Sequence, residues 1–179
     1  MIPIVLDRDG VINKDSDQFI KTADEYHLLP GAVSAIKRLN EAGFDVFVAS
    51  NQSGIGRGII SLTNLIKIQK KLVSLLAQEG AVIAAFLFCP HAPEANCQCR
   101  KPKPGLIHEI EHRVSESLSG NYFIGDRLSD AECAVNAGAI PLLVSTGKPL
   151  DKEKVTQAGY QQFETISEAV DFVLETTAI

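Results

Sequence analysis

Apolar residues fall into short continuous runs, separated by longer segments in which they recur every three or four positions. A short run of β-branched and bulky apolar residues is typical of a strand buried on both faces of a parallel sheet. Recurrence every three or four positions is typical of a helix with one apolar face. We therefore predict strands at 4–6, 44–49, 81–88, 122–124 and 140–144, and helices at 32–42, 62–78, 105–118 and 167–174.

Strands that alternate with helices predict the α/β class, with a central parallel sheet flanked by helices. A chain of 179 residues suffices for one hydrophobic core, so we expect a single domain over residues 1–179. No long insertion separates Asn13 from Gly31, or the segment 50–58 from Arg100, so there is room only for loops in addition to the predicted elements. The sequence therefore predicts no large cap domain.

Composition and charge narrow the function classes. The net charge of −5 and the pI of about 5.4 give no basic field for nucleic acid. No apolar run approaches the ~20 residues of a membrane span, and the N-terminus has no signal-peptide pattern. We expect a cytoplasmic monomer that acts on a small molecule, without nucleic acid or membrane partners.

The first predicted strand ends in two carboxylates, Asp7 and Asp9, followed by Gly10. Ligands in open α/β sheets bind just beyond the carboxyl ends of strands. Two carboxylates this close repel each other unless a cation neutralises them, and Mg²⁺ suits oxygen ligands. A solvated acidic turn is the alternative. The following segment, 14–18, leaves the same strand end and is either a solvated loop or a substrate-contacting one.

Two further segments offer groups for an anion. The second strand leads into 50–58, where three glycines and two serines can expose backbone N–H groups as an anion nest, or form a flexible turn. Arg100 and Lys101 are adjacent cations; Arg can bind phosphate through two hydrogen bonds and Lys acts as a point charge. A solvated basic patch is the alternative, and Lys103 has no role that we can assign.

Three of the four cysteines fall within residues 89–99, together with a histidine. Disulfides are rare in the cytoplasm, and four thiolate and imidazole groups are the usual ligands of structural zinc. Reduced surface cysteines are the alternative. The predicted ligands are Cys89, His91, Cys97 and Cys99. Cys133 stands apart on a later helix and is interpreted as a small buried apolar residue.

These segments together resemble the haloacid-dehalogenase-type phosphatases, with their Rossmann-like fold and four motifs in order. Motif I matches 7–13, and the resemblance implies that Asp7 is the nucleophile and Asp9 the general acid/base. Motif II matches Ser50, which would bind the transferring phosphoryl group, and motif III matches Lys101. In motif IV, Asp126 would complete a Mg²⁺ site with Asp7 and the main-chain carbonyl of Asp9. Asp130 either supports a metal-bound water or caps the next helix.

The cysteine segment resembles the zinc loop of one subgroup, which contains the heptose bisphosphate and histidinol-phosphate phosphatases. This implies a Mg²⁺-dependent phosphomonoester hydrolase with a structural Zn²⁺. The preferred substrate is D-glycero-D-manno-heptose 1,7-bisphosphate, cut at the 7-phosphate; histidinol phosphate is the alternative. A zinc-stabilised binding module without catalysis is an alternative of another class. The expected substrate-binding residues are Asp15, Ser16, Asp17, Gln18, Asn51, Gln52, Ser53, Arg100 and Arg127.

Overall fold

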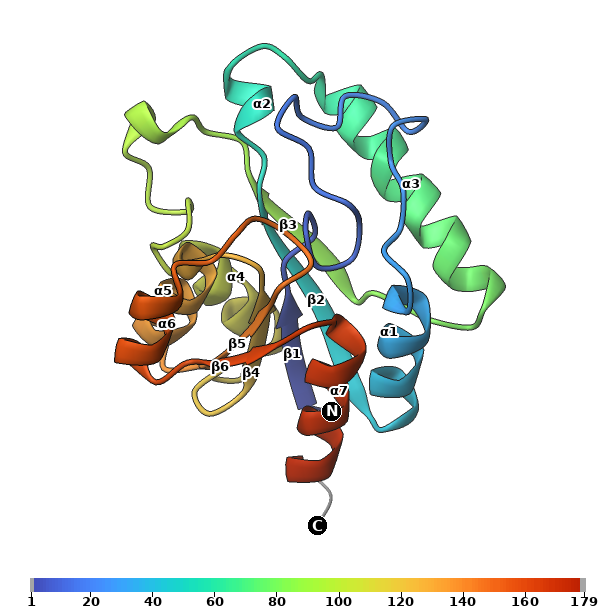
Figure 1. The fold of residues 1–179 in the computed structure, drawn as a ribbon. Helices are drawn as coiled ribbons and strands as arrows, with labels where there is room; N and C mark the ends of the chain where they lie inside the picture. The colour runs from blue at the N-terminus through green and yellow to red at the C-terminus, as the bar shows by residue number, and fades with distance from the viewer. Residues whose placement is uncertain (1, 178–179) are drawn as a thin grey trace.

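The computed structural model describes residues 2–177 and forms a six-stranded parallel sheet with helices on both faces (Figure 1). The strand order is β3-β2-β1-β4-β5-β6. The strands are β1 (Ile2–Leu6), β2 (Phe44–Asn51), β3 (Ala85–Cys89), β4 (Tyr122–Gly125), β5 (Ile140–Val144) and β6 (Gln161–Phe163). The helices are α1 (Ala32–Glu41), α2 (Ser53–Gly56), α3 (Leu62–Gln78), η1 (Pro93–Ala95), α4 (Gly105–Val114), α5 (Leu128–Asn136), α6 (Lys152–Ala158) and α7 (Ile166–Thr177). The predicted parallel α/β fold is confirmed.

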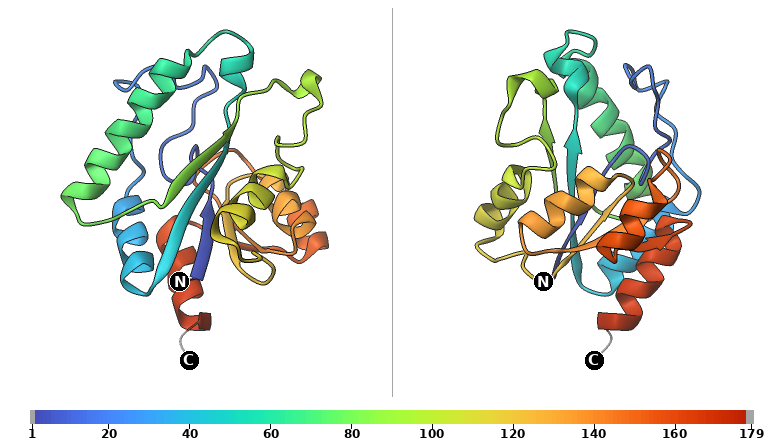
Figure 2. Two further views of the ribbon diagram at one scale, coloured as in Figure 1. Left: turned by 180° about the vertical axis from the view of Figure 1, so that it is seen from behind. Right: turned by 60° about the vertical axis from the view of Figure 1, so that its left-hand side comes forward.

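The core forms two layers, one on each face of the sheet. Helices α1, α3 and α7 pack on one face, against side chains that include Ile4 and Leu6 of β1. Helices α4 and α5 pack on the other face, against Val5 and Phe47. Successive residues of β1 thus point into opposite layers, which explains why this strand is apolar throughout. Figure 2 shows the two layers from other directions.

Two predicted boundaries differ from the structure by four residues, and the others by less. Residues 81–84 lie before β3, because Val82 is exposed and its N–H donates to the Asn40 side chain instead of to a strand. Helix α4 ends at Val114 and not near Leu118, since Ser115 has a left-handed backbone with φ 57°. The short elements α2, η1, α6 and β6 were not predicted. In α6, Val155 alone is buried, so the helix has no apolar periodicity for sequence analysis to detect.

The loops that matter for function all follow carboxyl ends of strands. Figure 1 shows the loop after β1, helix α2 and the loop after β3 beyond the same end of the sheet. The chain leaves β1 for β2 on one side and reaches β4 on the other, so the strand order reverses at β1. Such a switch point is where open α/β sheets bind ligands. No large cap domain stands over it in residues 2–177, as predicted.

Each helix within residues 2–177 is too short or too polar to cross a bilayer.

Candidate active site and metal centres

A cavity of about 530 Å³ opens beyond the carboxyl ends of β1, β2 and β4. It gathers almost every site residue that the sequence predicted. Among the predicted catalytic, magnesium and substrate-binding residues, Gln18 and Asp126 do not line it: Gln18 is exposed, and Asp126 is fully buried. The polar residues of the wall are Asp7, Arg8, Asp9, Asp15, Ser16, Asp17, Ser50, Asn51, Gln52, Ser53, Arg100, Lys101, Arg127, Ser129, Asp130 and Lys148.

Lys101 is a buried residue of the cavity lining. Its Nζ lies 2.9 Å from Asp7 Oδ1 and 2.7 Å from Asp130 Oδ1, and it donates to the Ala49 carbonyl at 2.8 Å. Burial favours a neutral amine, but the charges of Asp130 and Asp7 more than offset this and raise the pKa of Lys101. A permanent positive charge therefore stands between two carboxylates at the end of β1.

Asp7, Asp126 and Asp130 bring carboxylate oxygens within 4.8 Å of one another. Burial, with the charges of Asp7 and Asp130, raises the pKa of Asp126 to about 8. Its Oδ1 is buried without a hydrogen-bond partner, and buried polar atoms of that kind call for a bound ion or water. Clustered oxygen ligands with an orphaned carboxylate oxygen fit a hard divalent cation such as Mg²⁺.

The carboxylate of Asp9 points into a different set of partners. Arg8 donates from Nη2 to both Asp9 oxygens at 2.9 Å, and Asn13 and Gln52 each add a bond of 2.8 Å. Burial alone would raise the pKa of Asp9, but the Arg8 charge and these hydrogen bonds lower it below its ordinary value. Gln52 Nε2 also donates to Ser50 Oγ at 2.8 Å. The Asp9 side chain therefore lies outside the cluster of Asp7, Asp126 and Asp130.

Asp130 and Asn51 hold the backbone of other site residues. Asp130 Oδ2 accepts from the backbone N–H groups of Asp126 and Arg127 at 3.1 and 3.0 Å, which caps the start of α5. Its other oxygen faces Lys101, so capping and a place in the carboxylate cluster are combined in one side chain. Asn51 accepts from the Lys101 N–H at 3.1 Å and donates to the Lys101 carbonyl at 3.2 Å.

One rim of the cavity is an ion cluster. Arg127 Nη2 lies 2.8 Å from Asp15 Oδ2, and Lys148 pairs with both Asp15 and Asp17. The backbone N–H of Lys148 also donates to Asp126 Oδ2 at 3.1 Å. Sequence analysis assigned no role to Lys148, Arg8 or Asn13. The sequence signal that could have indicated Lys148 is the glycine before it, Gly147, just after a predicted strand. A residue without a side chain at this position lets the backbone approach Asp126 closely.

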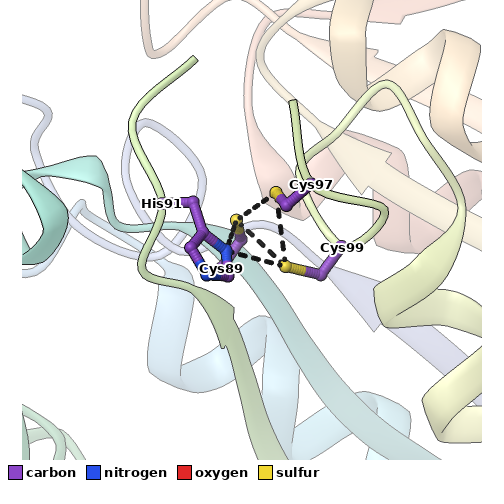
Figure 3. Close-up of side chains that lie close together, drawn as sticks. All are labelled: Cys89, His91, Cys97 and Cys99. Carbon is purple, nitrogen blue, oxygen red and sulfur yellow. Dashed lines mark hydrogen bonds between the residues drawn. The ribbon is translucent and has the colours of Figure 1, made fainter. Parts of the chain in front are cut away.

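The predicted zinc ligands converge in the structure. Figure 3 shows Cys89, His91, Cys97 and Cys99 pointing toward one another. The separations range from 3.2 Å for Cys89 and Cys99 Sγ to 3.6 Å for Cys97 and Cys99 Sγ, and Cys99 Sγ lies 3.3 Å from His91 Nδ1. Sulfur ligands about 2.3 Å from a common tetrahedral centre would lie roughly 3.7 Å apart, so this donor set fits a closed zinc site. Cys133 is fully buried and outside the cluster, as predicted.

Hydrogen bonds hold the cysteine loop together and join it to the segment after β2. Lys103 Nζ donates to the Cys97 carbonyl at 3.0 Å and to Asn96 Oδ1 at 2.8 Å, which gives Lys103 a role in holding the loop. The Cys89 carbonyl accepts from the Gln52 N–H at 2.7 Å. A Cβ on Gly56 would lie 2.7 Å from the Pro90 carbonyl, so the two loops pack closely.

Comparison with known proteins agrees with this geometry. Residues 4–159 match the family described as polynucleotide kinase 3 phosphatase. The chain is 42% identical over 172 residues to the D-glycero-β-D-manno-heptose-1,7-bisphosphate 7-phosphatase of Bordetella bronchiseptica, covering 96% of this chain and 95% of that protein. It is 47% identical over 145 residues to the protein of the same name from Pseudomonas putida, covering 81% of this chain and 83% of that protein.

A solved structure is similar over nearly the whole chain. The crystal structure of D,D-heptose 1,7-bisphosphate phosphatase from B. bronchiseptica, complexed with magnesium and phosphate, has a TM-score of 0.92 and 40% sequence identity. The match covers 99% of this chain and 100% of that chain.

Proposed function

This chain belongs to the polynucleotide kinase 3 phosphatase family, within the haloacid-dehalogenase-type phosphatases, and on this premise we propose that it removes the 7-phosphate of D-glycero-D-manno-heptose 1,7-bisphosphate. The relatives with this activity in their names support the substrate predicted from the sequence. The product would feed the supply of nucleotide-activated heptose for lipopolysaccharide or related glycans. The names of the relatives specify the β anomer, which is therefore the first one to test.

The observation that carries the catalytic assignment is the ammonium group of Lys101 shared between Asp7 and Asp130, next to the orphaned oxygen of Asp126. A protein that only bound a phosphosugar would need cations, not a set of buried carboxylates around one lysine. Phosphoryl transfer needs both an oxygen nucleophile and positive charge to stabilise the moving group. The arrangement therefore supports catalysis over the alternative of a binding module.

In the first half-reaction, an Asp7 oxygen forms a bond to phosphorus while the bond from phosphorus to the sugar oxygen breaks. Lys101 and the Ser50 hydroxyl hold the phosphoryl oxygens. Asp9 donates the proton that the departing sugar oxygen takes up. The negative charge of the bound phosphoryl group favours the protonated form of Asp9 that this step requires.

In the second half-reaction, water attacks the aspartyl-phosphate and Asp9 accepts its proton. The bond between Asp7 and phosphorus breaks, phosphate leaves and the Asp7 carboxylate is restored. We propose that Asp7, Asp126 and the main-chain carbonyl of Asp9 hold Mg²⁺, which when bound supplies positive charge that stabilises the phosphoryl group. Asp130 holds Lys101 and the start of α5 in place for both steps.

The remaining cavity residues would bind the sugar and its second phosphate. Arg100 and Arg127 supply positive charge from the loops after β3 and β4, and the polar side chains of 15–17 and 51–53 can bond to hydroxyl groups. We propose that Cys89, His91, Cys97 and Cys99 bind a structural Zn²⁺ that fixes the loop carrying Arg100 and Lys101. We also propose a single domain over 1–179 that works as a cytoplasmic monomer, where thiols stay reduced.

A substrate panel tests the proposal. Phosphate release is measured with and without Mg²⁺ from the β and α anomers of the heptose bisphosphate, from histidinol phosphate and from p-nitrophenyl phosphate. We expect Mg²⁺-dependent release, with the highest kcat/KM for a heptose bisphosphate. An equal or higher kcat/KM for histidinol phosphate would reject the proposed substrate. If no ester released phosphate either with or without Mg²⁺, the proposed catalysis would be rejected. Size-exclusion chromatography tests the monomer.

A further inference from the structure

Arg8 is an arginine buried between the two aspartates of the active site. Its side chain is 3% exposed, although arginine is among the residues least often buried. Within residues 2–177, Asp9 is its one ion-pair partner, met through Nε at 3.1 Å and through Nη2 at 2.9 Å to each carboxylate oxygen. Such a planar, two-point contact fixes the orientation of a carboxylate as well as its charge.

The surroundings of Arg8 prevent the pair from moving as a unit. The ring of Tyr26, itself 1% exposed, lies 5.8 Å from the Arg8 guanidinium carbon. Asn13 and Gln52 hold the Asp9 carboxylate from other directions. If Asp9 rotated away, Arg8 would be left as a buried charge without a partner, which is strongly unfavourable. The Asp9 carboxylate is therefore held in one orientation before substrate arrives.

We propose that Arg8 is a positioning residue, which holds the Asp9 carboxylate in the orientation needed to protonate the departing sugar oxygen. This inference rests on the proposed function, because it assigns Asp9 as the general acid/base. The Arg8 side chain is paired with Asp9, so its proposed role is exerted through Asp9. Substitution of Arg8 should consequently slow reactions whose leaving group needs a proton and leave reactions whose leaving group needs none nearly unchanged.

Leaving groups of different basicity provide the test. A sugar alkoxide needs a proton as it departs, whereas p-nitrophenolate departs readily without one. We compare kcat/KM, which covers events up to departure of the leaving group, for the heptose bisphosphate and for p-nitrophenyl phosphate. Loss of a general acid costs ~10²–10⁴-fold. We expect Arg8→Gln to reduce kcat/KM on the sugar phosphate about 10–100-fold and on the aryl phosphate less than about threefold.

Two further variants keep the result interpretable. Arg8→Lys keeps the charge but not the planar fork, and should fall between wild type and Arg8→Gln on the sugar phosphate, even if Arg8→Gln does not fold. Val173→Ala removes buried volume from α7, outside the cavity lining, and controls for general loss of stability. It should affect the two substrates equally.

The outcomes separate this inference from the proposed function. If Asp9→Asn shows the leaving-group dependence and the Arg8 variants do not, Asp9 keeps its role and the positioning role of Arg8 is rejected. If the Arg8 variants reduce kcat/KM for both substrates by the same factor, Arg8 has a structural role only. If Asp9→Asn itself reduces kcat/KM equally for both substrates, the general acid/base assignment fails, and the inference fails with it.

Discussion

The three aspartates nearest the proposed reaction have different environments. Burial raises the pKa of Asp7 to about 6, although the charge of Lys101 opposes this, and raises the pKa of Asp126 to about 8. The Arg8 charge and hydrogen bonds from Asn13 and Gln52 overcome the effect of burial on Asp9 and lower its pKa. Titratable groups whose pKa values are pushed apart in one site are typical of divided catalytic roles. The lowered pKa keeps Asp9 ionised in the free protein, so we expect it to take up the proton for the first step only once the phosphoryl group is bound. The raised pKa values fit Asp7 and Asp126 as carboxylates that a bound cation would ionise.

Asp7→Asn should abolish turnover on every substrate in the panel, including p-nitrophenyl phosphate. An amide is a poor nucleophile and a weaker Mg²⁺ ligand than a carboxylate. Steady-state assays test this, with thermal unfolding to show that the variant folds. The exposed Asp24, outside the cavity lining, offers a matched control, and Asp24→Asn should retain full activity. Measurable turnover of the aryl phosphate by Asp7→Asn would remove Asp7 from the nucleophile role.

Gly147→Ala should weaken Mg²⁺ binding without touching a proposed ligand. A Cβ on Gly147 would lie 2.7 Å from Asp126 Cβ and closer still to the Asp126 carboxylate, so this side chain must shift. Changes that displace a metal ligand typically reduce affinity or activity 10–100-fold. We expect the Mg²⁺ concentration for half-maximal activity to rise about tenfold. Ser145→Ala, in the same loop and exposed, is the control and should leave it unchanged.

At this scale, the sequence predicts positions better than contacts. Asp7, Ser50 and Asp126 follow predicted strands, and parallel strands bring their carboxyl ends to one edge, so their proximity could be inferred. The fork between Arg8 and Asp9 depends on side-chain rotamers, and the Asn51 bonds to Lys101 join residues 50 positions apart. Neither contact leaves a periodic or local signal. The sequence shows an arginine between the two aspartates of an Asp-x-Asp motif, but it does not show that this arginine is buried.

Among the elements, the cysteine loop is the one whose structure cannot arise from burial of an apolar face. Residues 90–98 are mostly exposed, and η1 has no buried residue. Its order therefore depends on the Cys and His cluster and on the Lys103 contacts to Asn96 and Cys97. The donor spacing made the cluster predictable from the sequence. The Lys103 contacts were not predictable, because a lysine after two basic residues looks like part of a solvated patch.

Cys97→Ser should reduce both zinc content and activity. Loss of one ligand loosens the loop that leads to Arg100 and Lys101, and misplacing a phosphate-binding cation by about 1 Å can reduce the rate ~10²-fold. Metal analysis by mass spectrometry and activity assays are run on the same preparations. Cys133→Ala, which removes the cysteine outside the cluster, should keep one zinc per chain. Full activity in Cys97→Ser, or wild-type protein without zinc, would contradict the structural-zinc proposal.

Across the whole molecule, the strand order places the opposing charges of the active site where helices cannot cover them. The segments after β1 and β4 supply the carboxylates, whereas Lys101 lies in the loop after β3 and Lys148 in the loop after β5. The alternation of apolar runs and helical periodicity predicted the first five strands of this sheet. It did not predict α6 and β6, because few of their residues are apolar and buried. Concentrating buried carboxylates at one edge should make the stability of the metal-free protein depend on pH.

The metal-free protein should lose stability as pH rises from about 4 to 8. The carboxyl groups of Asp7 and Asp126 have raised pKa values of about 6 and about 8 in the folded chain and ordinary values near 3.8 when unfolded. In that range the folded state holds protons that the unfolded state has released, so raising the pH favours unfolding. Mg²⁺ binds the ionised carboxylates and must displace these protons, so its apparent affinity should rise by up to about tenfold per pH unit between pH 6 and pH 8.

Thermal unfolding with and without Mg²⁺ at pH 6 and pH 8.5 measures this linkage, because other titrating groups cancel in the difference at each pH. We expect Mg²⁺ to raise Tm more at pH 8.5 than at pH 6. Calorimetry in buffers of different ionisation enthalpy should detect proton release on Mg²⁺ binding at pH 6.5. Asp126→Asn removes the group with the most strongly raised pKa and should leave a much smaller pH dependence, whereas Asp24→Asn should leave the wild-type dependence intact. An equal Tm gain at both pH values in the wild-type protein would mean that Mg²⁺ does not bind at the buried carboxylates.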